Sequence, residues 1–297
     1  MRSRQVIDVL DYQGQITAAR GGLVIRDQRV PLEDVAVLLV GNHASISGGA
    51  LSMLAKYDVT LLNCDWRGVP NFVGNPWGSN SRIATRHRAQ ADLSLPRQKS
   101  SWQALVRAKI LGQAFNLEQV GSSAATRLRL LASKVRSGDP DNLEGQAARL
   151  YWTEFFEDEQ FRRVPGAEDH CNAMLNYGYA VLRGFVIRGI CEAGLSPTLG
   201  LWHRNRSNPF CLADDLIEPF RPAVDATVHR LLPSDGLEDR SVKHELVNVT
   251  NLPMQGTGET VLTGIYTLAQ DLALFVEGEK VRLSVPDWQT PFASEDG

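Results

Sequence analysis

The hydrophobic pattern of this 297-residue chain changes once, near residue 80, and this change limits the folds open to it. Before that point, short apolar runs alternate with glycine and charged turn residues, a pattern typical of strands. After it, apolar residues recur at the three- and four-residue spacing of amphipathic helices. We therefore predict an α+β protein with a small β-rich N-terminal domain followed by a larger all-helical domain.

The N-terminal part contains six runs that favour strands and one that favours a helix. Val35–Val40 is the longest wholly apolar run and is expected to be a buried strand. A helix over 45–57 would place Ala50, Leu51 and Leu54 on one face and cover the sheet. The expected strands are 5–10, 15–19, 22–26, 28–31, 35–40 and 59–62.

Residues 71–81 are dense in Asn, Gly, Pro and Ser. They show neither the helical nor the alternating hydrophobic period, which is typical of a linker. We therefore expect a β-rich domain at 1–74, a linker at 75–86 and a helical domain at 87–297. The candidate helices of the second domain are 99–117, 122–137, 142–157, 170–193, 211–231, 237–251 and 258–276.

Composition excludes several classes of protein. With 43% hydrophobic and 22% charged residues, the chain can bury a core and is not a disordered tail. The longest apolar run has six residues, whereas a membrane-spanning helix needs about 20. No signal-peptide core follows Met1, so we expect a cytoplasmic protein without membrane contact. The four cysteines show no Cys-x-x-Cys spacing, which disfavours a zinc cluster.

Positive charge is concentrated in residues 82–136. This basic block contains eleven Lys or Arg but two acidic residues, in a chain whose formal net charge is −3. Such a block is either a solvated helix face or a phosphate-binding surface, and composition alone does not separate the two. Trp102 and Phe115 are its only aromatic residues, so contact with a DNA backbone is favoured over base stacking. The residues assigned to DNA binding are Arg82, Arg86, Arg88, Arg97 and Lys99.

Two of the polar segments in the helical part have simple structural explanations. Asp141 and Glu144 have the spacing of a capping box, in which Glu144 would serve its own helix terminus. A lone histidine such as His203 is more often a hydrogen-bonded or exposed side chain than a metal ligand. The segments that concentrate polar chemistry are 141–152, 200–203 and 214–222.

The third segment is harder to explain as an ordinary helix. Asp214, Asp215 and Glu218 are spaced to share a helical face, where like charges repel unless a cation compensates them. Arg221 is close enough along the chain to pair with Glu218. Prolines at 219 and 222 oppose a regular helix, which favours a specifically shaped site. Carboxylates with an imidazole suit Mg²⁺ or Mn²⁺.

These residues resemble a known family, the CRISPR-associated (Cas) integrases, and specifically the catalytic subunit of spacer acquisition, the first-numbered Cas protein. The resemblance covers nearly the whole chain and is closest to versions found with type II, single-effector systems. It rests on Asp141–Tyr151 (DNLEGQAARLY), Asp169–Tyr179 (D-x-x-N-x-x-L-N-Y-G-Y), His203 and Asp214–Pro222 (DDLIEPFRP), in the family's order.

The resemblance implies that Glu144, His203 and Glu218 are the catalytic residues and the ligands of Mg²⁺ or Mn²⁺. It further implies a second-shell or DNA-positioning role for Asn172, Asp215 and Arg221. Tyr177 and Tyr179 are equally well explained as core aromatics. The implied reaction is transesterification in antiviral spacer acquisition, where a 3′-hydroxyl of a short DNA duplex attacks a phosphodiester of the CRISPR repeat.

The implied partners are the spacer duplex, the repeat DNA, a second copy of the chain, a small ferredoxin-like second subunit and the RNA-guided effector nuclease. The N-terminal domain is expected to form the dimer. Two alternatives remain open: a structure-specific metal-dependent nuclease that uses water as nucleophile, and a catalytically silent DNA-binding scaffold. The preferred spacer and repeat sequences lie outside what the chain encodes.

Overall fold

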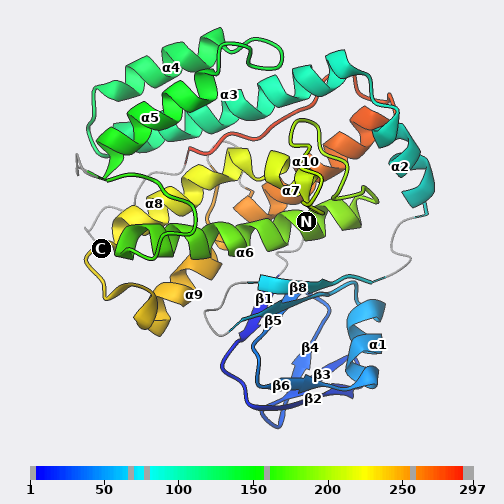
Figure 1. Ribbon diagram of the computed structural model, residues 1–297. Helices are drawn as coiled ribbons and strands as arrows, with labels where there is room; N and C mark the ends of the chain where they lie inside the picture. Colours follow the sequence, from blue (N-terminus) through cyan, green and yellow to red (C-terminus); the bar gives the residue numbers. More distant parts are fainter. Residues whose placement is uncertain (1–4, 66–69, 77–80, 157–160, 255–258, 290–297) are drawn as a thin grey trace. The chain divides into compact units, whose positions relative to one another are not determined.

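The structure is a computed structural model and describes residues 5–65, 70–76, 81–156, 161–254 and 259–289. The chain divides into two compact units, Met1–Ser81 and Arg82–Gly297, here called the N-terminal unit and the helical unit. The first is built mainly from strands and the second from helices, which confirms the predicted α+β class (Figure 1).

The N-terminal unit contains two four-stranded sheets. One has the order β1-β5-β7-β8, with β8 antiparallel to an otherwise parallel set, and the other has the order β4-β3-β2-β6. Arg26 and Asp27 join β3 to β4 with positive φ angles of 53° and 59°, as a tight hairpin turn of type I′ requires. The elements are β1 (Gln5–Val9), β2 (Gly14–Ala19), β3 (Gly22–Ile25), β4 (Gln28–Pro31), β5 (Val35–Val40), β6 (Ala44–Ile46), α1 (Gly48–Lys56), β7 (Thr60–Cys64) and β8 (Pro70–Gly74).

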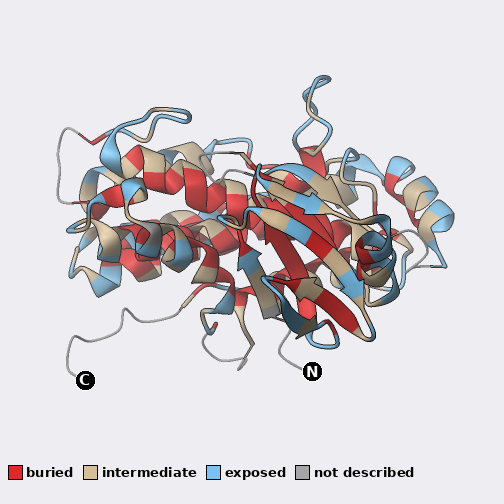
Figure 2. Cartoon of the chain, turned by 90° about the horizontal axis from the view of Figure 1, so that it is seen from below, coloured by how far each residue is buried: buried red, intermediate tan, exposed pale blue. Residues whose placement is uncertain are grey.

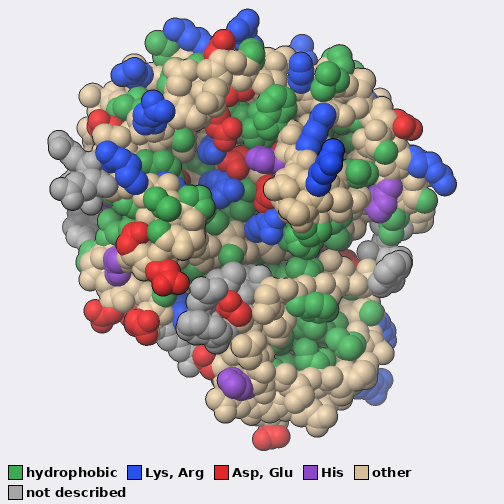
Figure 3. Space-filling view, in the orientation of Figure 1, with side chains coloured by type: hydrophobic (Ala, Val, Ile, Leu, Met, Phe, Trp, Pro, Cys, Tyr) green, Lys and Arg blue, Asp and Glu red, His purple; other side chains and the backbone are tan. Residues whose placement is uncertain are grey.

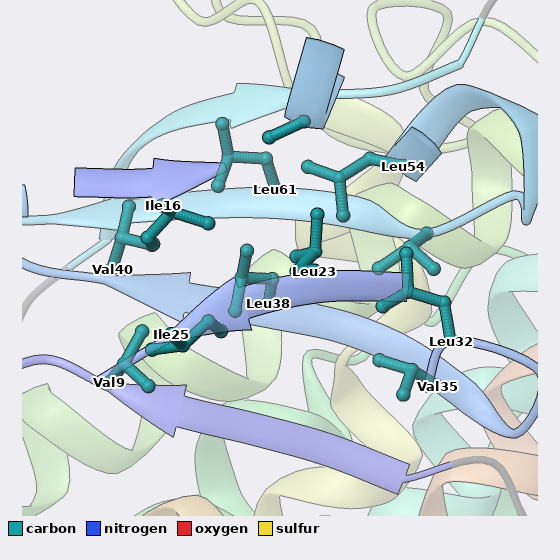
Figure 4. Packing of buried hydrophobic residues seen from close by; sticks show 12 residues of the cluster. Val9, Ile16, Leu23, Ile25, Leu32, Val35, Leu38, Val40, Leu54 and Leu61 are labelled. Carbon is teal, nitrogen blue, oxygen red and sulfur yellow. The ribbon is translucent and has the colours of Figure 1, made fainter. Parts of the chain in front are cut away.

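Aliphatic side chains from both sheets and from α1 form the core of this unit (Figure 4). All six residues of β5 are buried, because β5 lies between two neighbours in its sheet and contributes Val35, Leu38 and Val40 to the core. The expected strand at Val35–Val40 is confirmed. The apolar side chains of β5 are buried within the N-terminal unit, so their burial does not require a second copy of the chain.

In the helical unit, two long helices organise the others. The helices α4 and α5 pack on α3, whereas α9 and α10 pack on α6, and α7 and α8 contact both long helices (Figure 1). The α-helices are α2 (Ile83–Ala91), α3 (Leu95–Gln119), α4 (Ala124–Lys134), α5 (Leu143–Phe155), α6 (His170–Glu192), α7 (Cys211–Leu216), α8 (Arg221–Leu231), α9 (Arg240–Asn248) and α10 (Val261–Val276), with short 3₁₀ turns η1 (Glu218–Phe220), η2 (Gly236–Glu238) and η3 (Val249–Asn251).

Buried and exposed positions both occur along the helices (Figure 2). The helix α6 carries a nearly continuous run of buried residues from Tyr177 to Ile190. Within the described residues, no helix is both long and apolar enough to span a membrane. The helix α2 begins inside the stretch 75–86 that the sequence assigned to a linker.

The last described residues lie against α3. Trp288 is buried and donates its indole N–H to Asn116 Oδ1 at 2.9 Å. Gly112 permits this approach, because a Cβ there would meet Pro222 Cγ at 2.8 Å and Trp288 Cβ at 3.2 Å. The C-terminal segment therefore holds α3 and α8 in close contact.

Candidate functional site

The expected helix 211–231 is broken in the middle. It consists of α7, the 3₁₀ turn η1 and α8, because Pro219 and Pro222 each lack the N–H that a continuous helix would use. Glu218 lies in this 3₁₀ turn and is buried where η1 contacts α3. The charges of Asp214, Asp215 and Glu218 all act on His203, and the predicted common face for the three carboxylates stays a prediction.

Lys109 of α3 connects the two predicted glutamates. Its Nζ lies 2.6 Å from an oxygen of Glu144 on α5 and 2.5 Å from an oxygen of Glu218 in η1. The Lys109 side chain is 12% exposed and that of Glu218 is 6% exposed, so little water screens these ion pairs. Two negative groups from different elements thus share one cation.

The cap of α5 is supplied by other residues, which leaves the Glu144 carboxylate free to reach Lys109. Asn142 accepts the N–H of Gly145 at 3.2 Å, and Asp139 accepts the N–H groups of Leu143 and Glu144 at 2.9 and 3.0 Å. The capping-box interpretation of Glu144 is therefore wrong.

Glu218 is held ionised by a second cation. Arg221 donates its Nε–H to Glu218 at 2.9 Å, which confirms the predicted pairing. Burial opposes ionisation of Glu218, but Arg221 and Lys109 outweigh it and lower its pKa to about 2. Burial also opposes the charge on Lys109, while Glu218 and Glu144 raise its pKa above the ordinary value. Lys109 and Glu218 are therefore both charged at neutral pH.

Asp215 shapes the loop that carries His203. It is completely buried and accepts the backbone N–H groups of Leu201, Trp202 and His203 at 2.6, 3.1 and 3.1 Å. Its Oδ1 also lies 2.7 Å from Nδ1 of the His203 imidazole. This hydrogen bond raises the pKa of His203 above its ordinary value despite partial burial. The neighbouring Asp214 instead forms an ion pair with Arg183 at 2.6 Å.

Asn172 organises the loop before α6. It is buried, donates to the carbonyl of Arg162 at 2.9 Å and accepts from Arg163 Nη1 at 2.9 Å and from Val164 N at 3.0 Å. Arg163 also donates to Asn176 at 2.7 Å. Asn172 thus fixes Arg163 and its loop, and its predicted role toward the site or the DNA stays a prediction.

A buried aromatic and acidic pair lies beside these cations. Tyr179 donates its hydroxyl to Asp225, and the guanidinium carbons of Arg221 and Arg163 lie 4.6 and 5.3 Å from the centre of its ring. Burial raises the pKa of Asp225 to about 7, although the hydrogen bond from Tyr179 acts in the opposite direction. Tyr177 is also buried, as expected for a core aromatic.

Lys109, Glu218, Arg221, Tyr179 and Asp225 line a common cavity of about 210 Å³. On the face shown in Figure 3, acidic, basic and histidine side chains gather in a hollow of the helical unit. Sequence reasoning did not single out Lys109 or Asp225, although Lys109 lies in the basic block and Asp225 one helical turn after Arg221. The cavity is lined by Lys109, Gln113, Ala148, Trp152, Arg163, Pro165, Tyr179, Glu218, Arg221 and Asp225.

Two arginines of the basic block are engaged inside the helical unit. Arg86 is buried, pairs with Glu277 at 3.2 Å and donates to the carbonyl of Ala193 at 2.6 Å. Arg97 donates to the carbonyls of Phe275 and Lys280. Arg86 is therefore buried and already paired, which disfavours its predicted contact with a phosphate. Arg97 is half-buried and uses only its Nη2 atom in these bonds, so its predicted role stays a prediction.

The other members of that set remain accessible in part. Arg82 pairs with Glu277 at 3.0 Å, but its side chain is 51% exposed. Arg88 is exposed and Lys99 is half-buried. These three residues keep their predicted assignment to a phosphate-binding surface.

The three predicted metal ligands do not form one ready-made cluster. Among the described residues, no group of three His, Cys, Asp or Glu side chains is arranged to hold a metal ion. The reason is local: the Lys109 ammonium lies between Glu144 and Glu218, while His203 binds Asp215.

The donor chemistry nevertheless fits a divalent cation. Glu144 and Glu218 already converge on one positive charge, and carboxylate oxygens are the ligands that Mg²⁺ and Mn²⁺ prefer. The Nδ1 atom of His203 is oriented by a buried carboxylate, an arrangement that commonly supports a metal-binding imidazole through its other nitrogen.

Comparisons with known proteins identify the family of this chain. The family described as CRISPR associated protein Cas1 matches residues 9–252. A CRISPR-associated endonuclease Cas1 from Neisseria meningitidis serogroup C (strain 8013) is 44% identical over an alignment of 224 residues that covers 73% of this chain and 73% of the relative.

Two solved structures share the fold. One, described as a casposase bound to integration product, has a TM-score of 0.73 at 22% identity and covers 99% of this chain and 95% of its own. The other, a partial Cas6-RT-Cas1–Cas2 complex, has a TM-score of 0.67 at 17% identity and covers 95% and 98%. Because the family match extends over most of the sequence and the N. meningitidis relative is 44% identical, this chain belongs to the Cas1 family of CRISPR-associated proteins.

Proposed function

We propose that this chain is a divalent-metal-dependent DNA integrase that inserts short DNA spacers into a CRISPR repeat array. The observation that carries the proposal is the convergence of Glu144 and Glu218 on one buried cation, Lys109. Support also comes from the relative named an endonuclease and from the fold shared with a casposase bound to integration product.

The proposed reaction exchanges one phosphodiester for another. The 3′-hydroxyl oxygen of a spacer strand attacks a phosphorus atom of the repeat, forming a new P–O bond while the bond to the leaving 3′-oxygen breaks. The attacking hydroxyl loses its proton and the leaving oxygen gains one. Because one phosphodiester bond forms for each one that breaks, no external energy source is needed. The alternative is attack by water, which would make the chain a nuclease, as the name of its relative indicates.

The chain's own residues would prepare this chemistry. We assign Glu144, His203 and Glu218 to hold Mg²⁺ or Mn²⁺, which supplies positive charge that polarises a phosphodiester. Asp215 orients the imidazole of His203. Arg221 keeps Glu218 ionised, and it and Arg163 bring positive charge to the cavity where a phosphate would lie. Lys109 compensates the two carboxylates until a divalent cation does so.

The proposed partners follow from the neighbours and from charge. The resemblance to a Cas1–Cas2 complex supports assembly with a small second subunit, which we propose to be ferredoxin-like. Exposed cations of the basic block, such as Arg88, would contact the backbones of spacer and repeat DNA. We also propose a cytoplasmic homodimer formed through the N-terminal domain, in a system with an RNA-guided effector nuclease.

A branched-DNA assay tests the proposal. The purified chain, with and without Mg²⁺ or Mn²⁺, is incubated with a labelled spacer duplex and repeat DNA, and products are separated on a denaturing gel. Longer, joined strands support an integrase, shortened strands without joining support a nuclease, and binding alone supports a scaffold. Glu144→Gln and Glu218→Gln should abolish joining, whereas Glu118→Gln, an exposed pair with Arg129, should not. Joining at the wild-type rate by Glu218→Gln would refute the assignment.

A further inference from the structure

The buried Lys109 ammonium occupies the place at which the proposed function puts a divalent cation. It contacts Glu144 at 2.6 Å and Glu218 at 2.5 Å, and the Lys109 side chain is 12% exposed. A metal ion held by the same two carboxylates would compete with the ammonium for their oxygens. Lys109 is charged at neutral pH, so a displaced ammonium needs other acceptors, because an unpaired charge inside a protein is costly.

Two buried oxygens lie unused in the wall of the same cavity. Gln113 and Asp225 are 2% and 1% exposed, and both line the cavity that Lys109 lines. Among the described residues, Gln113 Oε1 and Asp225 Oδ2 have no hydrogen-bond partner, whereas Asp225 Oδ1 accepts from Tyr179. The Tyr151 hydroxyl is near enough to lower the pKa of Asp225 but forms its hydrogen bond with α3. Buried polar atoms are nearly always paired, so these two oxygens point to a donor that reaches them in another state of the chain.

Lys109 is placed to be that donor. Lys109 and Gln113 are four residues apart on α3, and side chains at this spacing are neighbours on one face of a helix. Asp225 of α8 faces the same cavity, and the charge of Lys109 acts on it, against the effect of burial on its pKa. The stem of lysine is flexible, so the ammonium can move within the cavity while the backbone of α3 stays in place.

The other cations of the cavity have different commitments. Arg163 is held by hydrogen bonds to two asparagines at 2.9 and 2.7 Å. Arg221 donates to Glu218 Oε1, whereas Lys109 contacts Glu218 Oε2. Lys109 is therefore the cation of this cavity that contacts both carboxylates assigned to the metal.

We propose that Gln113 and Asp225 are positioning residues, which together form a second position for the Lys109 ammonium when a divalent cation binds Glu144 and Glu218. Without the metal, Lys109 compensates the two carboxylates and keeps them together. With the metal, the ammonium moves to Gln113 Oε1 and Asp225 Oδ2, so its positive charge stays in the cavity where a phosphate would lie. The proposal rests on the proposed function for the metal.

Mn²⁺ binding to the full-length chain without DNA tests the second position. Free Mn²⁺ is followed by its electron paramagnetic resonance signal, at a pH above the Asp225 pKa of about 7. Gln113→Leu should weaken Mn²⁺ binding roughly tenfold or more, as expected for the loss of one hydrogen bond to a charged group. Gln119→Leu, at an exposed position on the same helix, should leave Mn²⁺ binding unchanged.

A double-mutant cycle with Lys109→Met separates this role from a general effect on packing. Once the ammonium is absent, Gln113→Leu should no longer weaken Mn²⁺ binding, because the amide has no cation to receive. Asp225→Asn should weaken Mn²⁺ binding more in the wild-type background than in Lys109→Met, where only the attraction of its charge is lost. Circular dichroism in the presence of Mn²⁺ checks that each variant is folded.

NMR of the lysine side chain provides a readout that does not depend on the stability of Lys109→Met. In the Mg²⁺-bound wild type, the ammonium hydrogens of Lys109 should stay protected from exchange with water, because the second position is buried. In Mg²⁺-bound Gln113→Leu they should exchange faster, whereas in Gln119→Leu they should exchange at the wild-type rate.

Equal losses of Mn²⁺ affinity in both backgrounds, or a Lys109 ammonium that exchanges rapidly with water in the Mg²⁺-bound wild type, would overturn the second position. Its failure is distinct from failure of the proposed function. A wild type that binds no Mn²⁺ would refute the proposed metal site together with the second position, whereas Mn²⁺ binding without coupling to Lys109 would refute the second position alone. Coupling without any strand joining would refute the integrase and leave the second position intact.

Discussion

Glu144 and Glu218 come from different helical elements, yet their carboxylates contact the same Lys109 ammonium at 2.6 and 2.5 Å. Glu144 lies on α5, whereas Glu218 lies in the 3₁₀ turn η1 between α7 and α8. The resulting geometry links stability to charge compensation in the helical unit.

Lys109→Met should destabilise the helical unit. Removing the ammonium leaves two mostly buried carboxylates without their shared cation, which typically costs about 3 kcal/mol or more. We expect a melting temperature several degrees below that of the wild type in EDTA, measured by circular dichroism.

Divalent metal should rescue this variant. Mn²⁺ should raise the melting temperature of Lys109→Met more than that of the wild type, because it replaces the missing charge between Glu144 and Glu218. Lys134→Met, at an exposed position on α4, serves as the control. Equal stability of Lys109→Met and the wild type in EDTA would contradict the shared-cation interpretation.

Asp215→Asn should lower the pKa of His203, measured by NMR titration of the metal-free protein. The folded-state pKa of His203 is raised by Asp215, so the stability due to this pair is present below about pH 6.5 and is lost as pH rises through the raised value. Asp214→Asn, next along the chain, should produce a smaller decrease because Asp214 acts only through its charge. Identical titrations of Asp215→Asn and the wild type would contradict the assignment.

Asp225→Asn should alter how stability depends on pH. Burial raises the pKa of Asp225 from 3.8 to about 7, so the folded chain holds its proton more tightly than the unfolded chain. This contribution is present below pH 3.8 and is lost as pH rises towards 7. The wild type should therefore lose stability relative to Asp225→Asn over that interval in urea titrations. A stability difference that does not vary with pH would show that Asp225 does not titrate in this range.

Phe72→Glu should weaken self-association if the N-terminal domain forms the dimer. Phe72 is 57% exposed on β8, which is an edge strand of its sheet, so an apolar side chain and unpaired backbone groups lie together at the surface. Light scattering should give a dimer for the full-length chain and a monomer for the variant, while Leu130→Glu stays dimeric. A monomeric wild type would refute the proposed dimer, and a dimeric Phe72→Glu would exclude this edge.

The sequence by itself determined the division into a β-rich and a helical part, because hydrophobic period follows local backbone geometry. It predicted the buried strand Val35–Val40 and the pairing of Arg221 with Glu218, since both depend on residues close along the chain. The family resemblance added Glu144 and His203 as candidate ligands.

Only the tertiary structure showed Lys109 between the glutamates and Asp215 beneath the His203 loop. It also disfavours a place for Arg86 in the predicted DNA-binding surface, because Arg86 is buried and paired with Glu277. Periodicity indicates which face of a helix is buried, but it does not indicate which polar group from a distant element will meet that face. That choice depends on how helices pack and where they break, so the charge partners of the site were decided by the fold.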